Sequence, residues 1–309
     1  TDWWAIIFNP SMPYRFAHMM LASFLTVGFL VAGVSALRWI IGDRSREVRS
    51  MLKTGVAMGA LLIPVQIFMG DMHGLNTLEH QPAKVAAMEG NWETQSNVPL
   101  LLFALPDEEA RENRFEIGIP NMASIILKHK ANGVVPGLND FVADDGTPEH
   151  PPVSPVFWSF RVMVGTGIAM LLISWTALWF MWRRRDRHEG RMAGHWLAVE
   201  GAPKPILWAL VPMALSGWVA TLAGWYTTEI GRQPWLVQGV MTTEMAVADV
   251  PAPMVMGTLV TYLVIYGALL AAYVGVIIYL ARKAAQGGEQ AGGMTHSGEA
   301  QVVAIQPAE

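Results

Sequence analysis

Residues 156–182 read VFWSFRVMVGTGIAMLLISWTALWFMW, and Arg161 is the only charged side chain among these 27 positions. A helix needs roughly 20 predominantly apolar residues to cross the hydrocarbon core of a bilayer. Four other stretches also qualify, so the sequence predicts five transmembrane helices, at residues 14–41, 54–69, 156–182, 205–226 and 254–280. The second stretch is the shortest and contains Pro64 and Gln66, so its alternative is a buried helix of a water-soluble protein.

The composition agrees with a membrane protein. Of the 309 residues, 52% are hydrophobic and 15% are charged, whereas soluble domains usually carry about a quarter charged residues. The net charge of −4 gives no sign of a nucleic-acid partner. The absence of Cys excludes disulfides, iron–sulfur clusters and thiolate ligation of haem. We therefore expect an all-α integral membrane protein that is surrounded by lipid.

The basic residues between the predicted helices give the orientation. Thirteen of the 21 Lys and Arg residues fall on one side of the membrane, which the positive-inside rule makes cytoplasmic. These are Arg38, Arg44, Arg46, Arg49, Lys53, Arg183, Arg184, Arg185, Arg187, Arg191, Lys204, Arg282 and Lys283. The N-terminus, the loop of residues 72–155 and the loop of residues 227–253 are then outside, and the C-terminus is cytoplasmic.

Four segments follow from this topology. Residues 1–71 hold the first two helices, residues 72–155 a long external loop, and residues 156–283 the last three helices. A loop this long is usually functional or disordered. The tail, residues 284–309, is rich in Gly, Gln and Ala and is predicted to be disordered. The chain begins with Thr, so we expect a fragment or a processed product.

His18 and Met163 are candidate haem ligands. Each lies one to two turns into its predicted helix from the outside, roughly 6–10 Å below the helix end. A His and a Met at similar depth can supply both axial ligands of a low-spin haem. Arg161, two residues nearer the surface than Met163, can meet a haem propionate. The alternatives are a core His bonded to a neighbouring backbone group and a Met that only packs.

Glu229 lies at the outer end of the fourth predicted helix, three residues before Arg232. This spacing favours an i,i+3 ion pair, which is worth roughly a few tenths of a kcal/mol. The functional alternative is a carboxylate ligand to haem iron, with Arg232 holding a propionate.

Lys84 and Glu89 lie five residues apart in the external loop, shortly before Trp92. Glu89 is suited to accept a proton from a quinol hydroxyl group, and Lys84 to donate a hydrogen bond to it. The alternative is a solvated surface helix.

These segments resemble subunit I of the cytochrome bd-type quinol oxidases. The resemblance covers nearly everything from Asn9 to about Ala281. Its most specific motif is GRQPW at residues 231–235, preceded by the family's haem-ligand Glu at position 229. Residues 157–163 and 16–18 resemble the segments with the Met and His ligands of low-spin haem b. Residues 70–95 resemble the start of the quinol-binding loop, with its Lys and Glu, in the short-loop, cyanide-insensitive branch.

The resemblance implies an electrogenic oxidase that is not a proton pump, in the inner membrane of a bacterium. Quinol is oxidised outside, and electrons pass through low-spin haem b to high-spin haem b at Glu229. They continue to haem d or a third haem b, where O2 becomes water. The family subunit has nine helices, and the five here match its last five. Expected partners are therefore the N-terminal four-helix part, subunit II and a small single-helix subunit.

The resemblance also implies that this chain by itself does not reduce O2. The ligand of the oxygen-reducing haem and the carboxylates of the proton path belong to the first four helices of the family subunit. The competing interpretation is a non-enzymatic membrane protein, either a haem binder or a carrier-like helical protein.

Overall fold

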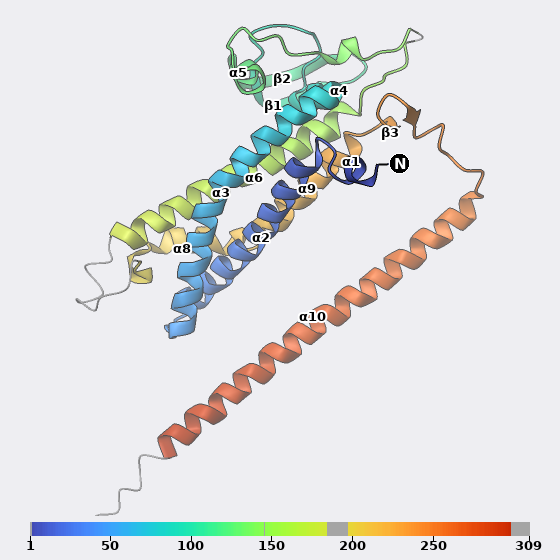
Figure 1. Ribbon diagram of the computed structural model, residues 1–309. Helices are drawn as coiled ribbons and strands as arrows, with labels where there is room; N and C mark the ends of the chain where they lie inside the picture. Colours follow the sequence, from blue (N-terminus) through green and yellow to red (C-terminus); the bar gives the residue numbers. More distant parts are fainter. Residues whose placement is uncertain (1, 145, 184–196, 298–309) are drawn as a thin grey trace, which may run out of the picture. The chain divides into compact units, whose positions relative to one another are not determined.

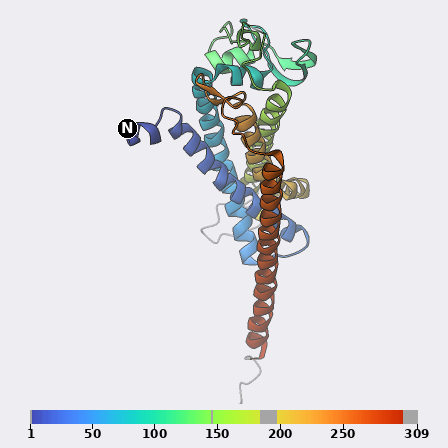
Figure 2. The ribbon, with the colours of Figure 1, turned by 90° about the vertical axis from the view of Figure 1, so that its right-hand side faces the viewer.

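The computed structural model describes residues 2–144, 146–183 and 197–297 (Figures 1 and 2). The chain divides into two compact units, Thr1–Ala246 and Val247–Glu309. The first unit holds the short helix α1 (Trp3–Ile7), the long helices α2 (Met12–Ile40), α3 (Arg46–His80) and α6 (Val153–Arg183), and the pair α8 (Lys204–Met213) and α9 (Ser216–Ile230). The second unit contains α10 (Ala252–Ser297).

The described helices agree with the predicted spans, with different ends. Four of them, α2, α3, α6 and the 252–276 part of α10, are long and apolar enough to cross a membrane. The pair α8 and α9 makes a fifth candidate if it is counted as one bent span. One difference is α3, which has 35 residues where 16 were predicted. The second predicted span is thus part of a longer helix.

Pro64 lies inside α3 without ending it. Proline has no backbone N–H, so the carbonyl group four residues earlier, at Ala60, loses its helical donor. The indole Nε1–H of Trp175 on α6 donates to this carbonyl at 2.9 Å. A buried carbonyl group without a donor is costly, and the neighbouring helix therefore supplies the missing bond.

The fourth predicted span is broken near its middle. The axes of α8 and α9 differ by 42°. Pro212 is the last residue but one of α8, where it removes a helical N–H. Ala214 and Leu215 then donate to the carbonyl groups three residues back, at 3.1 Å, instead of four. The break is therefore a proline-induced change of hydrogen-bond pattern.

The helices α2, α3, α6 and α9 form a ring in which each packs on two neighbours. α2 and α6 each contact both α3 and α9, so α2 and α6 are diagonal to one another. The approach of α2 to α3 is close at Gly55, where an added Cβ would lie 2.7 Å from the backbone nitrogen of Ala32. Glycine at this position lets the two helices meet.

The long loop is folded. It contains α4 (Pro82–Glu89), the antiparallel hairpin β1 (Leu100–Asp107) and β2 (Glu112–Ile119), the helix α5 (Met122–Lys128) and the 3-10 turn η1 (Leu138–Asp140). A second small hairpin, β3 (Trp235–Val237) with β4 (Met241–Thr242), follows α9. The protein is mostly helical, but these strands mean that the all-α prediction is wrong for the loops.

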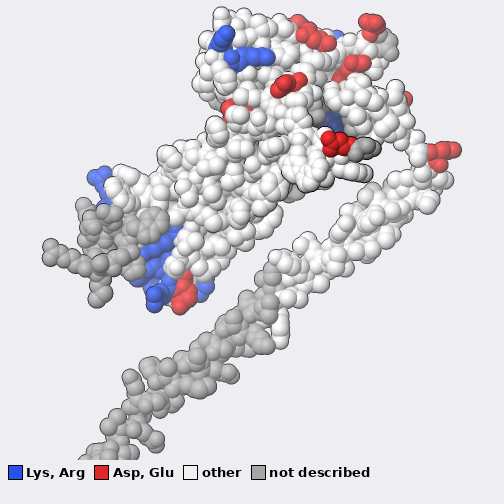
Figure 3. Space-filling model, in the orientation of Figure 1, with Lys and Arg blue, Asp and Glu red and all other residues white. Residues whose placement is uncertain are grey.

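The folded loop lies at one end of the ring, which we call the loop end. Lys and Arg residues gather at the opposite end (Figure 3). There Arg38 pairs with Asp43, Arg49 pairs with Glu200 at 2.8 Å, and the Arg44 guanidinium lies 4.0 Å from the Trp39 ring centroid. The basic residues predicted at positions 184–191 lie outside the described residues. In the second unit, α10 continues to Ser297, whereas disorder was predicted from residue 284.

Candidate functional site

His18 lies in the second turn of α2, at the loop end, and faces α3. The Nε2 atom of Gln66 is 3.1 Å from the His18 Nε2 atom, and the His73 ring centroid is 5.7 Å from that of His18. The Nδ1 atom of His18 and the Oε1 atom of Gln66 are buried and have no hydrogen-bond partner among the described residues. One ring nitrogen of His18 is thus available for a further ligand.

Met163 lies in the third turn of α6, on the helix diagonal to α2. Gly224 of α9 faces its thioether, because a Cβ at Gly224 would lie 2.9 Å from the Met163 Sδ atom. From the start of each helix, His18 is about 9 Å deep and Met163 about 15 Å deep at 1.5 Å per residue. Met163 is deeper than predicted because α6 begins at Val153, three residues before the predicted span.

Glu89 and Arg161 form a buried ion pair between the loop and α6. The Arg161 Nη2 atom donates to the Glu89 Oε2 atom at 2.8 Å, and the two side chains are only 10% and 7% exposed. The Arg161 guanidinium also lies 4.7 Å from the Phe157 ring centroid. Its buried Nε atom has no partner among the described residues. Arg161 therefore binds a carboxylate of the loop and keeps one donor free.

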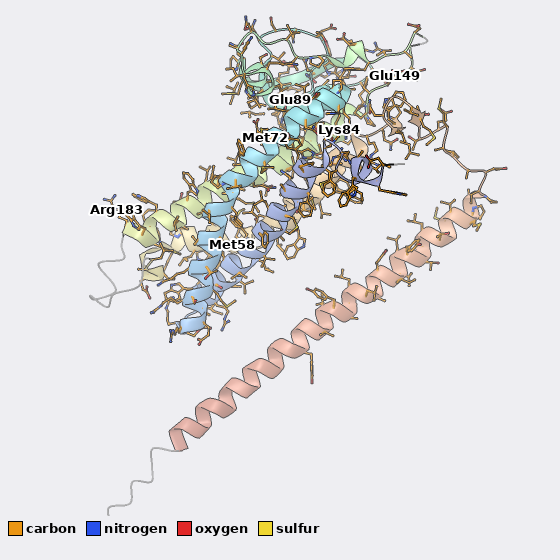
Figure 4. All side chains as sticks on the ribbon, in the orientation of Figure 1. Met58, Met72, Lys84, Glu89, Glu149 and Arg183 are labelled. Atoms are coloured by element: carbon orange, nitrogen blue, oxygen red, sulfur yellow. The ribbon has the colours of Figure 1, made fainter. Side chains whose placement is uncertain are left out.

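Lys84 is buried on α4, but its side chain points toward α9 and not toward the Glu89–Arg161 pair. Its Nζ atom donates to the Thr228 carbonyl oxygen of α9 at 3.3 Å. Burial, together with the positive charges of Arg15 and Arg232, lowers the pKa of Lys84 to about 8. Figure 4 labels both residues at the loop end. Five residues of helix turn through about 140° beyond one full turn, so Lys84 contacts α9 and Glu89 contacts α6. Neither is a solvated surface side chain.

Glu229 and Arg232 form the ion pair that their spacing favours. Their side-chain atoms are 3.1 Å apart, and the side chains are 43% and 37% exposed. A pair this exposed contributes little to stability. Lys84 packs beside this segment, because a Cβ at Gly231 would lie 3.1 Å from the Lys84 Cγ atom. The loop and the end of α9 are therefore in direct contact.

A cavity of about 290 Å³ lies between the end of α4 and the β1–β2 hairpin. Glu89 forms part of its wall, and Lys84 is not among the described residues that line it. The Asn113 side chain fixes the hairpin wall: it accepts from Trp92 Nε1 at 3.0 Å and donates to the Gly90 carbonyl oxygen at 2.8 Å. The cavity thus leads from the loop surface to the buried Glu89–Arg161 pair.

Sequence reasoning did not identify three residues that build this site. Gln66 was noted only as a polar interruption of a span, although a polar group at that position needs a partner. Asn113 is recognisable only from its contacts. Glu108 belongs to an acidic run, and its Oε1 atom accepts from the backbone nitrogens of Val153 and Ser154, at 2.9 and 3.4 Å. A carboxylate is favourable at this helix N-terminus.

The site residues fit a haem with its propionates. The free ring nitrogen of His18 and the thioether of Met163 are ligand types for low-spin haem iron, and they stand on diagonal helices of one ring. The free Nε–H of Arg161 suits a carboxylate acceptor. These orphaned buried atoms lie in the first three turns of α2 and α6. The fold and the site therefore define a helical membrane protein with candidate haem-binding residues below a folded loop.

Comparison with known families makes the assignment specific. The family model of cytochrome bd terminal oxidase subunit I matches residues 1–285. The chain belongs to this family, whose members are haem-bearing quinol oxidases of respiratory electron transport.

The chain is similar to cytochrome bd ubiquinol oxidase subunit 1 of Bacillus subtilis, with 31% identity over 92% of this chain and 59% of that protein. It is 27% identical to the cytochrome bd-II ubiquinol oxidase subunit 1 of Escherichia coli, over 80% of this chain and 57% of that protein. The solved bd oxidase from Geobacillus thermodenitrificans superposes with a TM-score of 0.76 at 29% identity, covering 91% of this chain and 60% of that one. The chain thus spans about three fifths of these relatives.

Proposed function

We propose that this chain forms the quinol-oxidising, haem-bearing part of a membrane quinol:oxygen oxidoreductase. The observation that carries the proposal is the buried Glu89–Arg161 ion pair. It joins the folded loop to the helix that bears Met163, at the end of the ring where His18 also lies. A substrate site in the loop is then next to the candidate haem pocket, as electron transfer between them requires.

The loop residues act on quinol. Oxidation of a quinol releases two electrons and two protons, so the site needs a base near a hydroxyl group. Glu89 accepts a proton from the hydroxyl group, and Lys84 donates a hydrogen bond to quinol. Because Lys84 and Glu89 point to different sides of α4, the head group lies across this helix, bordered by α6 and α9.

The helix residues hold the haems. His18 and Met163 ligate a low-spin haem b, and Arg161 donates to one of its propionates. Glu229 ligates a high-spin haem b, with Arg232 at a propionate. When bound, these groups supply one-electron transfer and, together with haem d or a third haem b, the reduction of O2 to water. The ligand of the third haem comes from the N-terminal four-helix part of subunit I.

The orientation of the chain in the membrane is proposed from the charge distribution, and its partner subunits are proposed from the family. The arginine-rich end faces the cytoplasm of a bacterium, and the N-terminus and the quinol loop lie outside the inner membrane. Protons leave quinol outside while those consumed come from inside, so the reaction separates charge without pumping. The partners are the N-terminal four-helix part of subunit I, subunit II and a small single-helix subunit.

Optical spectroscopy of the assembled complex tests this function. The reduced-minus-oxidised spectrum is expected to show haem bands, and added quinol is expected to produce the reduced spectrum and then oxygen uptake. A complex without haem bands would be a carrier-like helical protein. Bands that quinol does not reduce would indicate a passive haem binder. Either result would refute the proposal.

A further inference from the structure

We propose that the 290 Å³ cavity beside Glu89 is the route by which protons taken from quinol leave for the water outside. This inference rests on the proposed function, because it assigns the path of the protons that quinol oxidation releases. It gives the cavity a role other than binding the quinol head group.

The position of the cavity separates it from the place where quinol contacts both loop residues. Glu89 lines the cavity, whereas Lys84 faces α9 and is not among the described lining residues. A head group that contacts both side chains therefore lies on another side of Glu89. One carboxylate thus stands between the quinol site and the cavity.

The lining suits water and protons. Three carboxylates besides Glu89 border the cavity, on the exposed side chains of Glu93, Glu112 and Glu116, and Arg111 is the one basic residue among the described lining groups. The volume holds roughly ten water molecules at about 30 Å³ each. Carboxylates create a negative potential, which raises the local concentration of cations such as the hydrated proton.

The proton balance closes at Glu89. Quinol gives up two electrons, which pass to the haems, and two protons. Glu89 accepts one proton at a time from a hydroxyl group and becomes a neutral carboxyl group. It then gives this proton to water in the cavity and returns to the carboxylate that pairs with Arg161. Glu89 carries one proton at a time, so each proton is released into the cavity before the next is accepted.

The walls of the route are held by groups that are already hydrogen-bonded. The Glu116 Oε1 atom accepts from Asn113 Nδ2 at 2.8 Å, and the Glu93 Oε1 atom accepts from Asn139 Nδ2 at 2.6 Å. A change from Glu to Gln keeps an oxygen acceptor at both positions. It removes only the negative charge and the ability to bind and release a proton. The route can therefore be tested without removing these hydrogen bonds.

The test uses the assembled oxidase with Glu93, Glu112 and Glu116 changed together to Gln. The matched control changes Glu79, Glu109 and Glu149 to Gln, which removes the same charge from exposed positions that do not line the cavity. In a stopped-flow experiment, a pH-sensitive dye follows proton release while absorbance follows haem reduction by quinol. Steady-state kcat and KM for quinol are measured with and without imidazole as a small mobile buffer.

In the cavity variant we expect proton release to lag severalfold behind haem reduction, and imidazole to remove the lag. The KM for quinol should stay unchanged, and the control variant should behave as the unmodified complex does. Proton release that stays synchronous with haem reduction would overturn the route. A raised KM with synchronous release would instead identify the cavity as the quinol pocket. If the unmodified complex does not oxidise quinol, the proposed function itself fails.

Discussion

Replacing Arg161 with Met removes the guanidinium group from the Glu89–Arg161 pair and keeps most of the side-chain volume. Glu89 would then be an ion without a counter-charge in a place where its side chain is only 7% exposed. Loss of one partner of a buried ion pair costs about 3–5 kcal/mol of unfolding free energy. The cation–π contact of Arg161 with Phe157 is lost as well.

A double-mutant cycle separates the pair from its surroundings. Glu89→Gln alone keeps an oxygen acceptor for Arg161, and the double variant Glu89→Gln, Arg161→Met contains neither buried charge. The double variant should therefore be less destabilised than the sum of the single variants, by about 1–3 kcal/mol. The exposed pair of Arg114 and Asp107 is the control, because the Arg114 side chain is 61% exposed. Arg114→Met should cost less than about 1 kcal/mol.

The assay is unfolding of the purified protein in mixed micelles of increasing denaturing detergent, followed by tryptophan fluorescence. Arg161→Met should unfold at a much lower detergent fraction than Arg114→Met. Equal midpoints for these two variants would refute the reasoning, since the Glu89–Arg161 pair would then contribute no more than a surface pair. Additive single effects would show that the two side chains do not interact.

Three further predictions concern other parts of the site. Met163→Leu should convert the low-spin haem b to high-spin or lose it, whereas an unchanged low-spin spectrum in a folded variant would remove Met163 as a ligand. Trp175→Phe should cost about 1–3 kcal/mol of unfolding free energy, because the Ala60 carbonyl group loses its donor; Trp208→Phe is the control, because it removes an indole of the same exposure, 55% against 54% for Trp175. Unfolding free energy should rise from about pH 8 to pH 10.5, because unfolded Lys84 binds a proton there that folded Lys84 has lost. A Lys84→Met variant that keeps the same rise would show that another group causes it.

The sequence predicted the helices well where hydrophobicity alone decides them. Residues 156–182 form most of α6, because an apolar segment of this length with a single charge is stable as a helix that crosses the bilayer. The prediction ended the second span at residue 69, whereas α3 continues to His80. The β1–β2 hairpin was not predicted, because its position depends on Asn113 bonds to Trp92 and Gly90, which lie more than 20 residues away.

The chemistry of the candidate site was predictable by residue type, but its pairing was not. Glu89 and Lys84 were predicted to belong to one quinol site, and this stays a prediction; the direction of each side chain, Glu89 toward α6 and Lys84 toward α9, was not predictable. Arg161 was expected at a propionate, and its Nη2 atom binds Glu89, 72 positions away in the chain. Such pairs depend on how helices dock, and periodicity within one segment carries no information about that.

The bond from Glu108 to the first residues of α6 has a consequence for changes in chain length. This bond joins two residues that are 45 positions apart, so it holds both ends of that stretch in place when the chain between them changes in length. Lengthening a flexible closed loop is cheap, at about 0.6 kcal/mol for each doubling of its length. Insertions next to Ala143 or Gly146, which are not among the described residues that line the cavity, should therefore leave the helices undisturbed. A longer connection between Glu108 and Val153 is thus compatible with the same start of α6.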